Sequence, residues 1–536
     1  MYFSEIKQLI LKNLDKNATL KVCLDEKFGD LAVYGLKNND LDCDFIEKTQ
    51  IINNFLNIFI KKPILFESII REILDKRVKK NKERIILEYL SPNTNKPLHV
   101  GHLRNGFLGM TLANIFKELG YSVSRINLIN DRGEHICKSM LAYQKWGKGQ
   151  TPESLGMKPD HFIGYWYVMY SQKETPELRE EVHEMLRKWE QKDRKILALW
   201  KKMNNWVYKG FEQTYKKTGL EFDKTYYESK VYQLGKKIIE KGIKKGIFYK
   251  GKQGDVLFDL PEKEFGLNKD GSLKKITVLR KDKTSVYLTQ DLGIANLKYK
   301  DFKFNKSIYV VGLEQDYYFK CLFYILKSLG YKWAEKCFHL SYGMVYLPEG
   351  KMKSREGKVI DADNLVDDIQ KLVEKKYDLK DNSLEIALSA IKFNLLLIQP
   401  KQDIHFNLEK SIALEGKTGP YCQYSLVRAL SILEKAKLFK NPNFSKLLLE
   451  KEIILIRQLS TYSEVLQRSA ESFNPGLFTN YVYELAKSFN QFYDSCPVLK
   501  AKDEETIQAR LYLVKAFSII MEKGLNILNI SCLKKM

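Results

Sequence analysis

The sequence predicts an α/β protein in which a parallel sheet is preceded by an α+β segment and followed by an all-α segment. A strand, a loop, a helix and a second strand follow one another between residues 85 and 129, which is the βαβ unit that opens a parallel sheet. Strand patterns fade after Pro400 and helical periodicity takes over. The chain has 536 residues, more than one hydrophobic core usually serves, so we expect three domains: 1–80, 81–400 and 401–536.

The composition is that of a folded protein with a strong positive charge. Apolar residues make up 44% and charged residues 29% of the chain, and no apolar run approaches the roughly 20 residues of a membrane-spanning helix. The first residues, MYFSEIKQLILKNL, are an amphipathic mixture rather than a signal peptide. The net charge of +23 favours nucleic acid as a partner only slightly over a plain lysine-rich surface.

The cysteines indicate a reducing compartment. There are eight of them, and none forms a Cys-X-X-Cys pair. This spacing disfavours a structural zinc site and is typical of reduced thiols in the cytoplasm. We therefore expect a cytoplasmic protein. The sequence contains no cluster of carboxylates that would suggest a dedicated metal site.

The elements of the first part can be placed in order along the chain. Short apolar patches in the first eighty or so residues end in the basic run 77–84, which we expect to be a linker. Residues 85–90 form a buried strand that carries one carboxylate, Glu88, and the turn-forming residues 91–97 end it. Apolar residues at helical spacing predict a helix over 103–119, and SVSRINLI predicts the second strand.

The middle of the chain differs from the segments on either side of it. Residues from about 150 to 250 are predicted to be a mostly helical insertion, with one long charged helical stretch from Pro176 to Val207. Alternating segments then return as VYLTQDLGIA, SIYVVGLEQD and HLSYGMVYL. We expect these to be strands and strand ends of the second half of the sheet.

Two loops carry residues that suit phosphate chemistry. His99-Val100-Gly101-His102 opens the first helix, where the helix dipole, unpaired N–H groups and a glycine that permits close approach all favour an anion. Considered alone, this pattern could equally be a metal-binding pair or a packing feature. The glycine-bounded segment 350–357 contains three cations that could close over a triphosphate, although an exposed basic turn is the simpler interpretation of that segment alone.

In this order, the two loops resemble the paired signatures of class I aminoacyl-tRNA synthetases. The segments SPNTNKPLHVGHLRN, INDRGEHICKSM, YLTQDLG and GPYCQYSLVR further resemble arginyl-tRNA synthetases. The resemblance extends from about residue 50 to Met536. It implies a Rossmann-like catalytic domain at 81–400, an N-terminal tRNA-contacting domain at 1–80 and a helical anticodon-binding domain at 401–536.

The resemblance implies an arginine–tRNA ligase. Such an enzyme joins arginine to ATP, giving arginyl-adenylate and pyrophosphate, and then transfers the arginyl group to the terminal ribose of tRNA(Arg). We expect Mg²⁺ to accompany ATP as its counter-ion, no tightly bound cofactor, no membrane association, and a monomer rather than an oligomer. Family members commonly need tRNA before they activate arginine. The alternatives are a synthetase for another amino acid and a non-catalytic RNA-binding relative.

The resemblance also implies a pocket for arginine. Glu88 and Asp291 are expected to pair with its guanidinium and ammonium groups, because a cation with a planar fork of donors needs carboxylate acceptors. Asn93, Tyr287 and Gln315 are expected to complete the pocket. From the residues alone, Glu88 could instead be a strand-end residue facing solvent, and Asp291 could be a helix cap.

The ATP contacts follow from the same resemblance. They are expected to come from His99, Gly101, His102, Met344 and Lys351. Ser354 stands where the family's loop usually has a lysine, and Lys96, just upstream of HVGH, is expected to replace it. The groups expected to carry the catalysis are therefore His99, His102, Lys96, Lys351, Lys353 and Arg355.

Contacts with tRNA are expected at both ends of the chain. Tyr421, Tyr424 and Arg428 lie at helical spacing, so that two rings and a guanidinium share one face on which unpaired bases can stack. An aromatic stripe of this kind is more often part of a core. Phe55 and Asn57 are candidates for contacting the corner of the tRNA.

Overall fold

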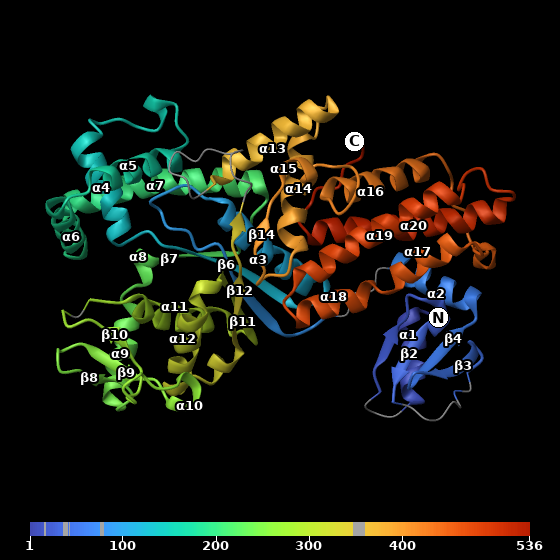
Figure 1. Cartoon of the computed structure of the whole chain (residues 1–536), viewed down its shortest axis with the longest axis horizontal. Helices are drawn as coiled ribbons and strands as arrows, with labels where there is room; N and C mark the ends of the chain where they lie inside the picture. The colour runs from blue at the N-terminus through green and yellow to red at the C-terminus, as the bar shows by residue number, and fades with distance from the viewer. Residues whose placement is uncertain (15–17, 36–40, 42, 76–79, 283, 347–359) are drawn as a thin grey trace.

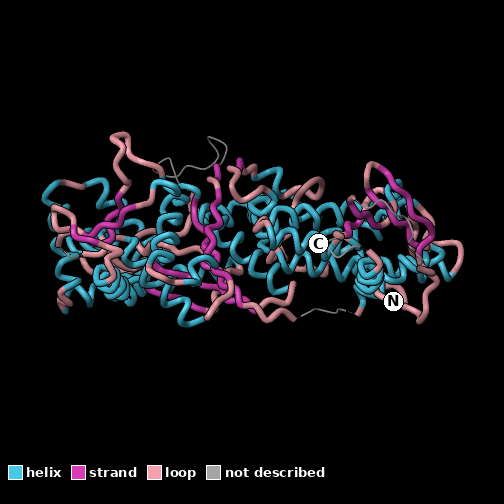
Figure 2. Tube along the Cα trace, turned by 90° about the horizontal axis from the view of Figure 1, so that it is seen from below, coloured by secondary structure: helices cyan, strands magenta, loops and turns pink. Residues whose placement is uncertain are grey.

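The computed structural model describes every residue of the chain except 15–17, 36–40, 42, 76–79, 283 and 347–359. The molecule is elongated in both Figure 1 and Figure 2. A parallel sheet and its helices occupy one half, a helical bundle occupies the other, and the N-terminal unit lies against that bundle (Figure 1). Among the described residues, no helix is long and apolar enough to cross a membrane.

A five-stranded parallel sheet forms the centre of the first half. Its strands are β5 (Arg84–Glu88), β6 (Ser122–Ile129), β7 (Lys224–Tyr227), β11 (Lys306–Gly312) and β12 (Cys337–Tyr342). The spatial order is β12-β11-β5-β6-β7, with all neighbours parallel. The order reverses between β5 and β11, and ligands of such sheets bind at the carboxyl ends of the strands at this reversal. The predicted α/β class and βαβ unit are confirmed.

The described residues after Pro400 are mostly helical, as the sequence predicts, and two further helices, α13 (Ala362–Tyr377) and α14 (Ser383–Leu397), already lie between β12 and Pro400. After Pro400 the helices are, in chain order, α15 (Leu408–Ser411), α16 (Gly419–Glu434), α17 (Glu450–Ser460), α18 (Tyr462–Glu471), α19 (Pro475–Ser495) and α20 (Glu504–Ile527). Two short strands, β13 (Val345–Tyr346) and β14 (Ile404–His405), pair in parallel at the junction with the sheet.

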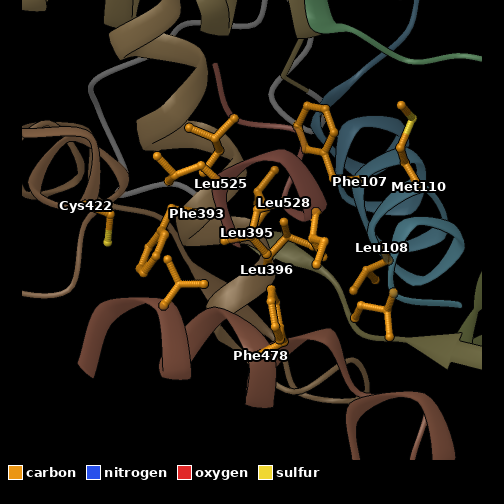
Figure 3. Close-up of a cluster of buried hydrophobic side chains, with 14 of the residues drawn as sticks. Phe107, Leu108, Met110, Phe393, Leu395, Leu396, Cys422, Phe478, Leu525 and Leu528 are labelled. Atoms are coloured by element: carbon orange, nitrogen blue, oxygen red, sulfur yellow. The ribbon is translucent and has the colours of Figure 1, made fainter. Parts of the chain in front are cut away.

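Helix α3 (Val100–Glu118) connects β5 to β6 and is buried over most of its length. On the sheet side a Cβ at Gly109 would lie 2.4 Å from the ring of Tyr89, so glycine permits the close packing of helix and strand. On the other side, Phe107 and Leu108 lie in one buried cluster with side chains of α14, α19 and α20 (Figure 3). Helix α3 therefore joins the sheet to the helical bundle.

Four helices lie between β6 and β7: α4 (Glu134–Trp146), α5 (Pro159–Lys173), α6 (Pro176–Glu190) and α7 (Arg194–Thr218). The long helical stretch predicted from Pro176 is two helices, because the Asp193 carboxylate accepts from the N–H groups of Lys195 at 2.9 Å and Ile196 at 3.0 Å and starts a new helix. The segment predicted as an insertion at 150–250 also contains β7, which is an edge strand of the main sheet.

The segment between β7 and β11 corrects one prediction. It contains α8 (Glu228–Val231), α9 (Leu234–Lys244), α10 (Glu262–Phe265), α11 (Tyr287–Phe302) and a small antiparallel sheet of β8 (Tyr249–Lys250), β9 (Val256–Asp259) and β10 (Lys275–Leu279). VYLTQDLGIA, predicted as a strand, opens α11. Its alternation is short, whereas Leu288, Leu292 and Ala295 recur at helical spacing and are buried. The other two predicted strands are confirmed as β11 and β12, which α12 (Asp316–Ser328) connects.

The N-terminal unit is an antiparallel sheet with two helices, α1 (Phe3–Lys12) and α2 (Lys62–Leu74). Its strands, in the order β1-β2-β4-β3, are β1 (Leu20–Val22), β2 (Leu31–Tyr34), β3 (Ile46–Ile52) and β4 (Phe55–Ile60). A buried ion pair holds this unit to the bundle, since Arg457 Nη2 of α17 lies 2.5 Å from Asp30 Oδ1. The predicted linker 77–84 lies partly outside the described residues, and Arg84 already belongs to β5.

Candidate functional site

The loop after β5 is held in an uncommon backbone conformation. Leu90 and Ser91 have positive φ angles of 75° and 45°, which residues other than glycine rarely adopt. Asn105 Oδ1 accepts a hydrogen bond from the Leu90 N–H at 2.5 Å, and Asn127 Oδ1 accepts one from the Ser91 N–H at 3.2 Å. Asn93, a predicted pocket residue, follows this turn and is exposed. Backbone strain that neighbouring side chains maintain is typical of functional sites.

The two histidines of HVGH lie together at the start of α3. The centroids of the His99 and His102 rings are 3.8 Å apart, and His102 Nδ1 accepts a hydrogen bond from the His99 N–H at 3.1 Å. That bond leaves the proton of a neutral His102 ring on Nε2. Burial and the Lys96 ammonium lower the pKa of His99 to about 4, and burial, His99 and Lys96 hold the pKa of His102 well below its usual range. Both rings are neutral at pH 7, and each can donate a hydrogen bond to a phosphate oxygen.

Gly101 and Lys96 fit the same phosphate-binding interpretation. A Cβ at residue 101 would lie 3.1 Å from two atoms of the His99 ring, so glycine leaves room for that ring. Lys96 is half-buried, burial lowers the pKa of its ammonium, and its charge acts on both histidines. The start of α3 therefore gathers a cation, two neutral donors and the helix N–H groups.

The KMKSREG segment lies outside the described residues, and with it Lys351, Lys353 and Arg355. The residues that follow this segment contact the start of α3. Ile360 O accepts from the Val100 N–H at 2.9 Å, and the Ala362 N–H donates to Leu98 O at 3.0 Å. Met344, which precedes the segment, is 59% exposed.

Glu88 is buried at the end of β5, but its charge is already compensated. Lys298 Nζ of α11 lies 2.8 Å from Glu88 Oε2 and is fully buried. The same ammonium lies 3.9 Å from the ring centroid of Tyr309 in β11. Glu88 is therefore not turned to solvent, which excludes the strand-end alternative. Glu88 is also paired with Lys298, whereas the pocket expected from the sequence treats Glu88 as a carboxylate that is free to pair with arginine.

Asp291 lies near Glu88, in the interior of α11, so it is not a helix cap. Its carboxylate accepts a hydrogen bond from the Tyr318 hydroxyl. Burial raises the pKa of Asp291 to about 6; Tyr318 and Lys298 act in the opposite direction, and Glu88 adds to the increase. Lys298, which pairs with Glu88, lies two turns further along α11, and the charges of Glu88 and Lys298 both act on Asp291.

The structure adds a carboxylate that sequence reasoning missed, Glu228. This residue follows β7 at the carboxyl edge of the sheet and is 7% exposed. Its carboxylate is 3.8 Å from Arg132, whose guanidinium pairs more closely with Glu190 at 2.6 Å. Burial raises the pKa of Glu228 to about 7, with Arg132 lowering it and the charges of Asp131 and Asp291 raising it further. The charge of Asp291 thus acts on Glu228, and these two carboxylates are called the acidic pair.

Tyr287 and Gln315 lie at the borders of this acidic pair. Tyr287 begins α11 and is 70% exposed, and burial and the charge of Glu228 raise the pKa of its hydroxyl. Gln315 is half-buried just after β11, the neighbour of β5. The pattern KTYY followed by a carboxylate could have identified Glu228, because Glu88 likewise stands at the carboxyl end of its strand. The prediction that residues 150–250 form an insertion conceals this strand of the main sheet and the carboxylate that follows it.

The helical bundle contains a cavity next to part of the predicted aromatic stripe. Arg428 of α16 lies 4.5 Å from the ring centroid of Tyr424 and 4.9 Å from that of Tyr493 in α19. These three side chains, with Lys435 and Lys500, are among those that line a cavity of about 690 Å³. Aromatic rings, a guanidinium and lysines are the groups that bind an unpaired base and its phosphate.

The other predicted tRNA contacts have different surroundings. Tyr421 is half-buried beside Tyr483, with 5.7 Å between ring centroids, outside the lining of that cavity. Phe55 meets the exposed ring of Tyr34 edge-on at 5.2 Å. Asn57 is 2% exposed, and its side-chain amide donates to Phe55 O at 3.1 Å. The buried side chain of Asn57 is not accessible for a direct contact in this structure, so its predicted role in tRNA binding stays a prediction.

Three groups that could hold a metal ion, Asp160, His161 and Asp363, lie where α5 meets α13. An internal cation already occupies the cluster, since Lys158 Nζ is 3.1 Å from Asp160 Oδ2 and 2.7 Å from Asp363 Oδ2. Burial alone would raise the pKa of Asp363, but hydrogen bonds from His161 and Lys158 lower it to about 2. The cluster therefore ties two helices together.

Comparison with known proteins agrees with this geometry. Residues 65–403 match the family model described as tRNA synthetases class I (R), catalytic domain, and residues 422–536 match the DALR anticodon binding domain. An arginine–tRNA ligase of Treponema denticola is 42% identical over 529 residues, which span 94% of this chain and 88% of the relative. An arginine–tRNA ligase of Borreliella afzelii is 44% identical over 469 residues, spanning 85% of this chain and 80% of the relative.

Solved structures show the same architecture. The Thermus thermophilus arginyl-tRNA synthetase matches with a TM-score of 0.85 and 25% identity, covering 100% of both chains. The Plasmodium falciparum enzyme of the same name shares the fold, with a TM-score of 0.75 and 17% identity over 99% of this chain and 98% of that one. On the strength of the sequence relatives and the two family models, the chain belongs to the arginyl-tRNA synthetase family and is an arginine–tRNA ligase that uses ATP.

Proposed function

We propose that Asp291 and Glu228 form the site at which this ligase selects arginine. Glu228 is buried and Asp291 is half-buried, and desolvation raises the pKa values of both carboxylates more than the nearby cations Arg132 and Lys298 lower them. Among the described residues, the cation nearest Glu228 in an ion pair is Arg132 at 3.8 Å, and Arg132 is held more closely by Glu190. Arginine supplies a planar guanidinium with five donors. This acidic pair is the observation that carries the proposal.

The ion pair of Glu88 and Lys298 adjusts the charge of the site. Because these two charges cancel, Glu88 adds no net negative charge to that of Asp291 and Glu228. Free arginine carries two cationic groups, the guanidinium and the α-ammonium, so two carboxylates match it. We assign Glu88 a role in shaping and polarising the pocket beside Lys298. Asn93, Tyr287 and Gln315 are proposed as its polar borders.

The start of α3 is proposed to hold the triphosphate. His99 and His102 donate hydrogen bonds as neutral rings, Lys96 supplies charge, and Gly101 permits close approach of the backbone. Met344 is proposed as an apolar contact of the nucleotide. Lys351, Lys353 and Arg355 keep the role expected from the sequence, as cations for the departing pyrophosphate.

The reaction needs positioning and charge stabilisation rather than a covalent enzyme intermediate. A carboxylate oxygen of arginine attacks the α-phosphorus of ATP, and the bond to the bridging oxygen breaks so that pyrophosphate leaves with the electron pair. A terminal ribose hydroxyl of tRNA(Arg) then attacks the carbonyl carbon of arginyl-adenylate, loses its proton, and AMP leaves. Mg²⁺ is proposed to enter with ATP. We do not assign it to Asp160 and Asp363, because Lys158 occupies that cluster.

Contacts with tRNA are proposed on two units. The cavity beside Tyr424 and Arg428 suits an unpaired anticodon base, and Tyr421 extends the same helix face. In the N-terminal unit, the ring pair of Phe55 and Tyr34 is proposed to meet another part of the tRNA. The roles proposed for 1–80, 81–400 and 401–536 are therefore tRNA contact, catalysis and anticodon binding.

We propose that the reaction takes place in the cytoplasm. All eight cysteines are free thiols, which is typical of the cytoplasm. A monomer is proposed to be the active form.

ATP–pyrophosphate exchange tests the proposal. Each amino acid is assayed with and without tRNA(Arg), and arginine alone is expected to support exchange, with tRNA required. Exchange driven by another amino acid would contradict the assignment of the acidic pair. No exchange with any amino acid would favour a non-catalytic RNA-binding protein.

A further inference from the structure

Arg104 lies on α3 two residues after the HVGH motif, and its side chain is completely buried. All of the hydrogen bonds that it makes with the described residues are to backbone carbonyl oxygens. A buried cation is costly unless its donors are used, and burial lowers the pKa of Arg104 to about 10 while Tyr342 and Asp403 oppose the change. The two terminal nitrogens are satisfied in this way, whereas Nε has no hydrogen-bond partner among the described residues.

The carbonyls belong to two segments that are distant in sequence from α3. Arg104 Nη1 donates at 2.7 and 3.1 Å to Gly343 O and Met344 O. Arg104 Nη2 donates at 3.3, 2.9 and 2.6 Å to Gln399 O, Pro400 O and Gln402 O. The first segment leads into β13, and the second connects α14 to β14.

The two segments also bind each other. The Gly343 N–H donates to Pro400 O at 2.9 Å, the Met344 N–H donates to Asp403 Oδ1 at 2.7 Å, and β13 pairs with β14. Their approach needs a glycine, since a Cβ at Gly343 would lie 2.6 Å from Asp403 Oδ1. Arg104 thus fixes a two-segment ribbon, as one body, against the helix that begins with HVGH.

We propose that Arg104 is a positioning residue for ATP: through five backbone carbonyls it sets Met344 and the β13–β14 ribbon at a fixed place relative to His99 and His102. The residues after the KMKSREG segment reach α3 through backbone bonds of Leu98 and Val100. The same helix therefore holds the chain on both sides of that segment. This inference rests on the proposed ATP role of the start of α3.

A guanidinium suits this task better than an ammonium. Its two terminal nitrogens point in fixed directions and serve both segments at once, whereas a lysine ammonium is one point with three donors. Arg104→Lys keeps the charge and loses the fork, so it tests the geometry rather than the charge.

The test compares Arg104→Lys with Thr111→Val in ATP–pyrophosphate exchange with tRNA present. Thr111 is a matched control, because it is two turns further along α3, fully buried, and its hydroxyl has no hydrogen-bond partner among the described residues. We expect Arg104→Lys to raise the KM for ATP by about tenfold, corresponding to about 1.4 kcal/mol, with the KM for arginine changed less than about twofold. Thr111→Val should change neither KM.

Two further measurements keep the inference testable if Arg104→Lys folds poorly. Gly343→Ala separates the two segments while leaving Arg104 in place, and it should also raise the KM for ATP selectively. Amide hydrogen exchange should quicken at Val345, Ile404 and Phe406 in both variants. Equal changes in both KM values, or a loss of thermal stability with unchanged kinetics, would show a merely structural role. Arginine-dependent exchange by the unaltered chain tests the proposed function separately.

Discussion

Replacing Glu228 by glutamine should weaken arginine binding and at the same time stabilise the protein. The fold raises the pKa of Glu228 from its ordinary value of 4.5 to about 7, so ionising this carboxylate is harder in the folded than in the unfolded chain. The stability cost is absent below pH 4.5, grows up to pH 7 and is complete above it. At about 1.4 kcal/mol for each pH unit, ionised Glu228 costs the fold about 3 kcal/mol at pH 8.

Glu228→Gln removes that cost and the repulsion from Asp291, so the free energy of unfolding at pH 8 should rise by up to about 3 kcal/mol. Losing one charge partner of a buried cationic ligand typically costs about 2–5 kcal/mol, so the dissociation constant for arginine should increase at least tenfold. Urea unfolding at pH 8 and equilibrium binding of radiolabelled arginine, with tRNA present, measure the two effects.

Glu88→Gln is the matched comparison, because it neutralises a buried carboxylate of the same acidic region. It leaves Lys298 buried without its partner at 2.8 Å, so it should destabilise the fold by about 3–5 kcal/mol. Adding Lys298→Met should recover much of that loss. If Glu228→Gln were destabilised as strongly as Glu88→Gln, or bound arginine as tightly as the unaltered chain, the assignment of the free charge to Glu228 would be refuted.

Three further predictions concern pH, phosphate and tRNA. Glu228 and Asp291 have pKa values of about 7 and about 6, and both must be ionised to hold a cation. The KM for arginine should therefore rise about twentyfold as the pH falls from about 8 to about 6, and a flat profile would count against both residues. His102→Ala should lower the activation rate by about 10²–10³ by removing an Nε2–H donor, as pyrophosphate exchange would show, whereas unchanged exchange would exclude the phosphate role. Tyr424→Ala should weaken tRNA binding by about 1–3 kcal/mol in a filter assay without changing the KM for ATP, and a loss of folding instead would favour a core role for the ring.

The features that could be predicted from the sequence are local. The βαβ unit follows from apolar spacing and a turn-rich loop, and the start of α3 follows from a short motif with a clear electrostatic use. The segment that opens α11 was predicted wrongly, because four alternating residues looked like a strand although the buried positions continue at helical spacing. Local pattern and tertiary packing disagreed there, and packing decided the structure.

The features that could not be predicted depend on contacts across the chain. The partner of Glu88 lies 210 residues away on α11, so its buried ion pair is invisible in the local sequence. Arg104 likewise reaches carbonyls more than two hundred residues away, and backbone acceptors leave no trace in side-chain identity. Asn57 alternates with apolar residues as an exposed strand position would, yet its side chain is 2% exposed and donates to Phe55 O.

The selection of arginine by the acidic pair is tested most directly with citrulline, which matches arginine in shape but replaces the guanidinium by a neutral ureido group. The ratio of the dissociation constants of citrulline and arginine is measured for the unaltered chain and for the double variant Glu228→Gln, Asp291→Asn, with tRNA present. The unaltered chain should favour arginine by at least about thirtyfold, since the charge contact of the guanidinium, which is typically worth about 2–5 kcal/mol in a buried site, is lost with citrulline. In the double variant the ratio should fall to within about a factor of ten of unity. An unchanged ratio would contradict the account, because it would place the recognition of the guanidinium elsewhere.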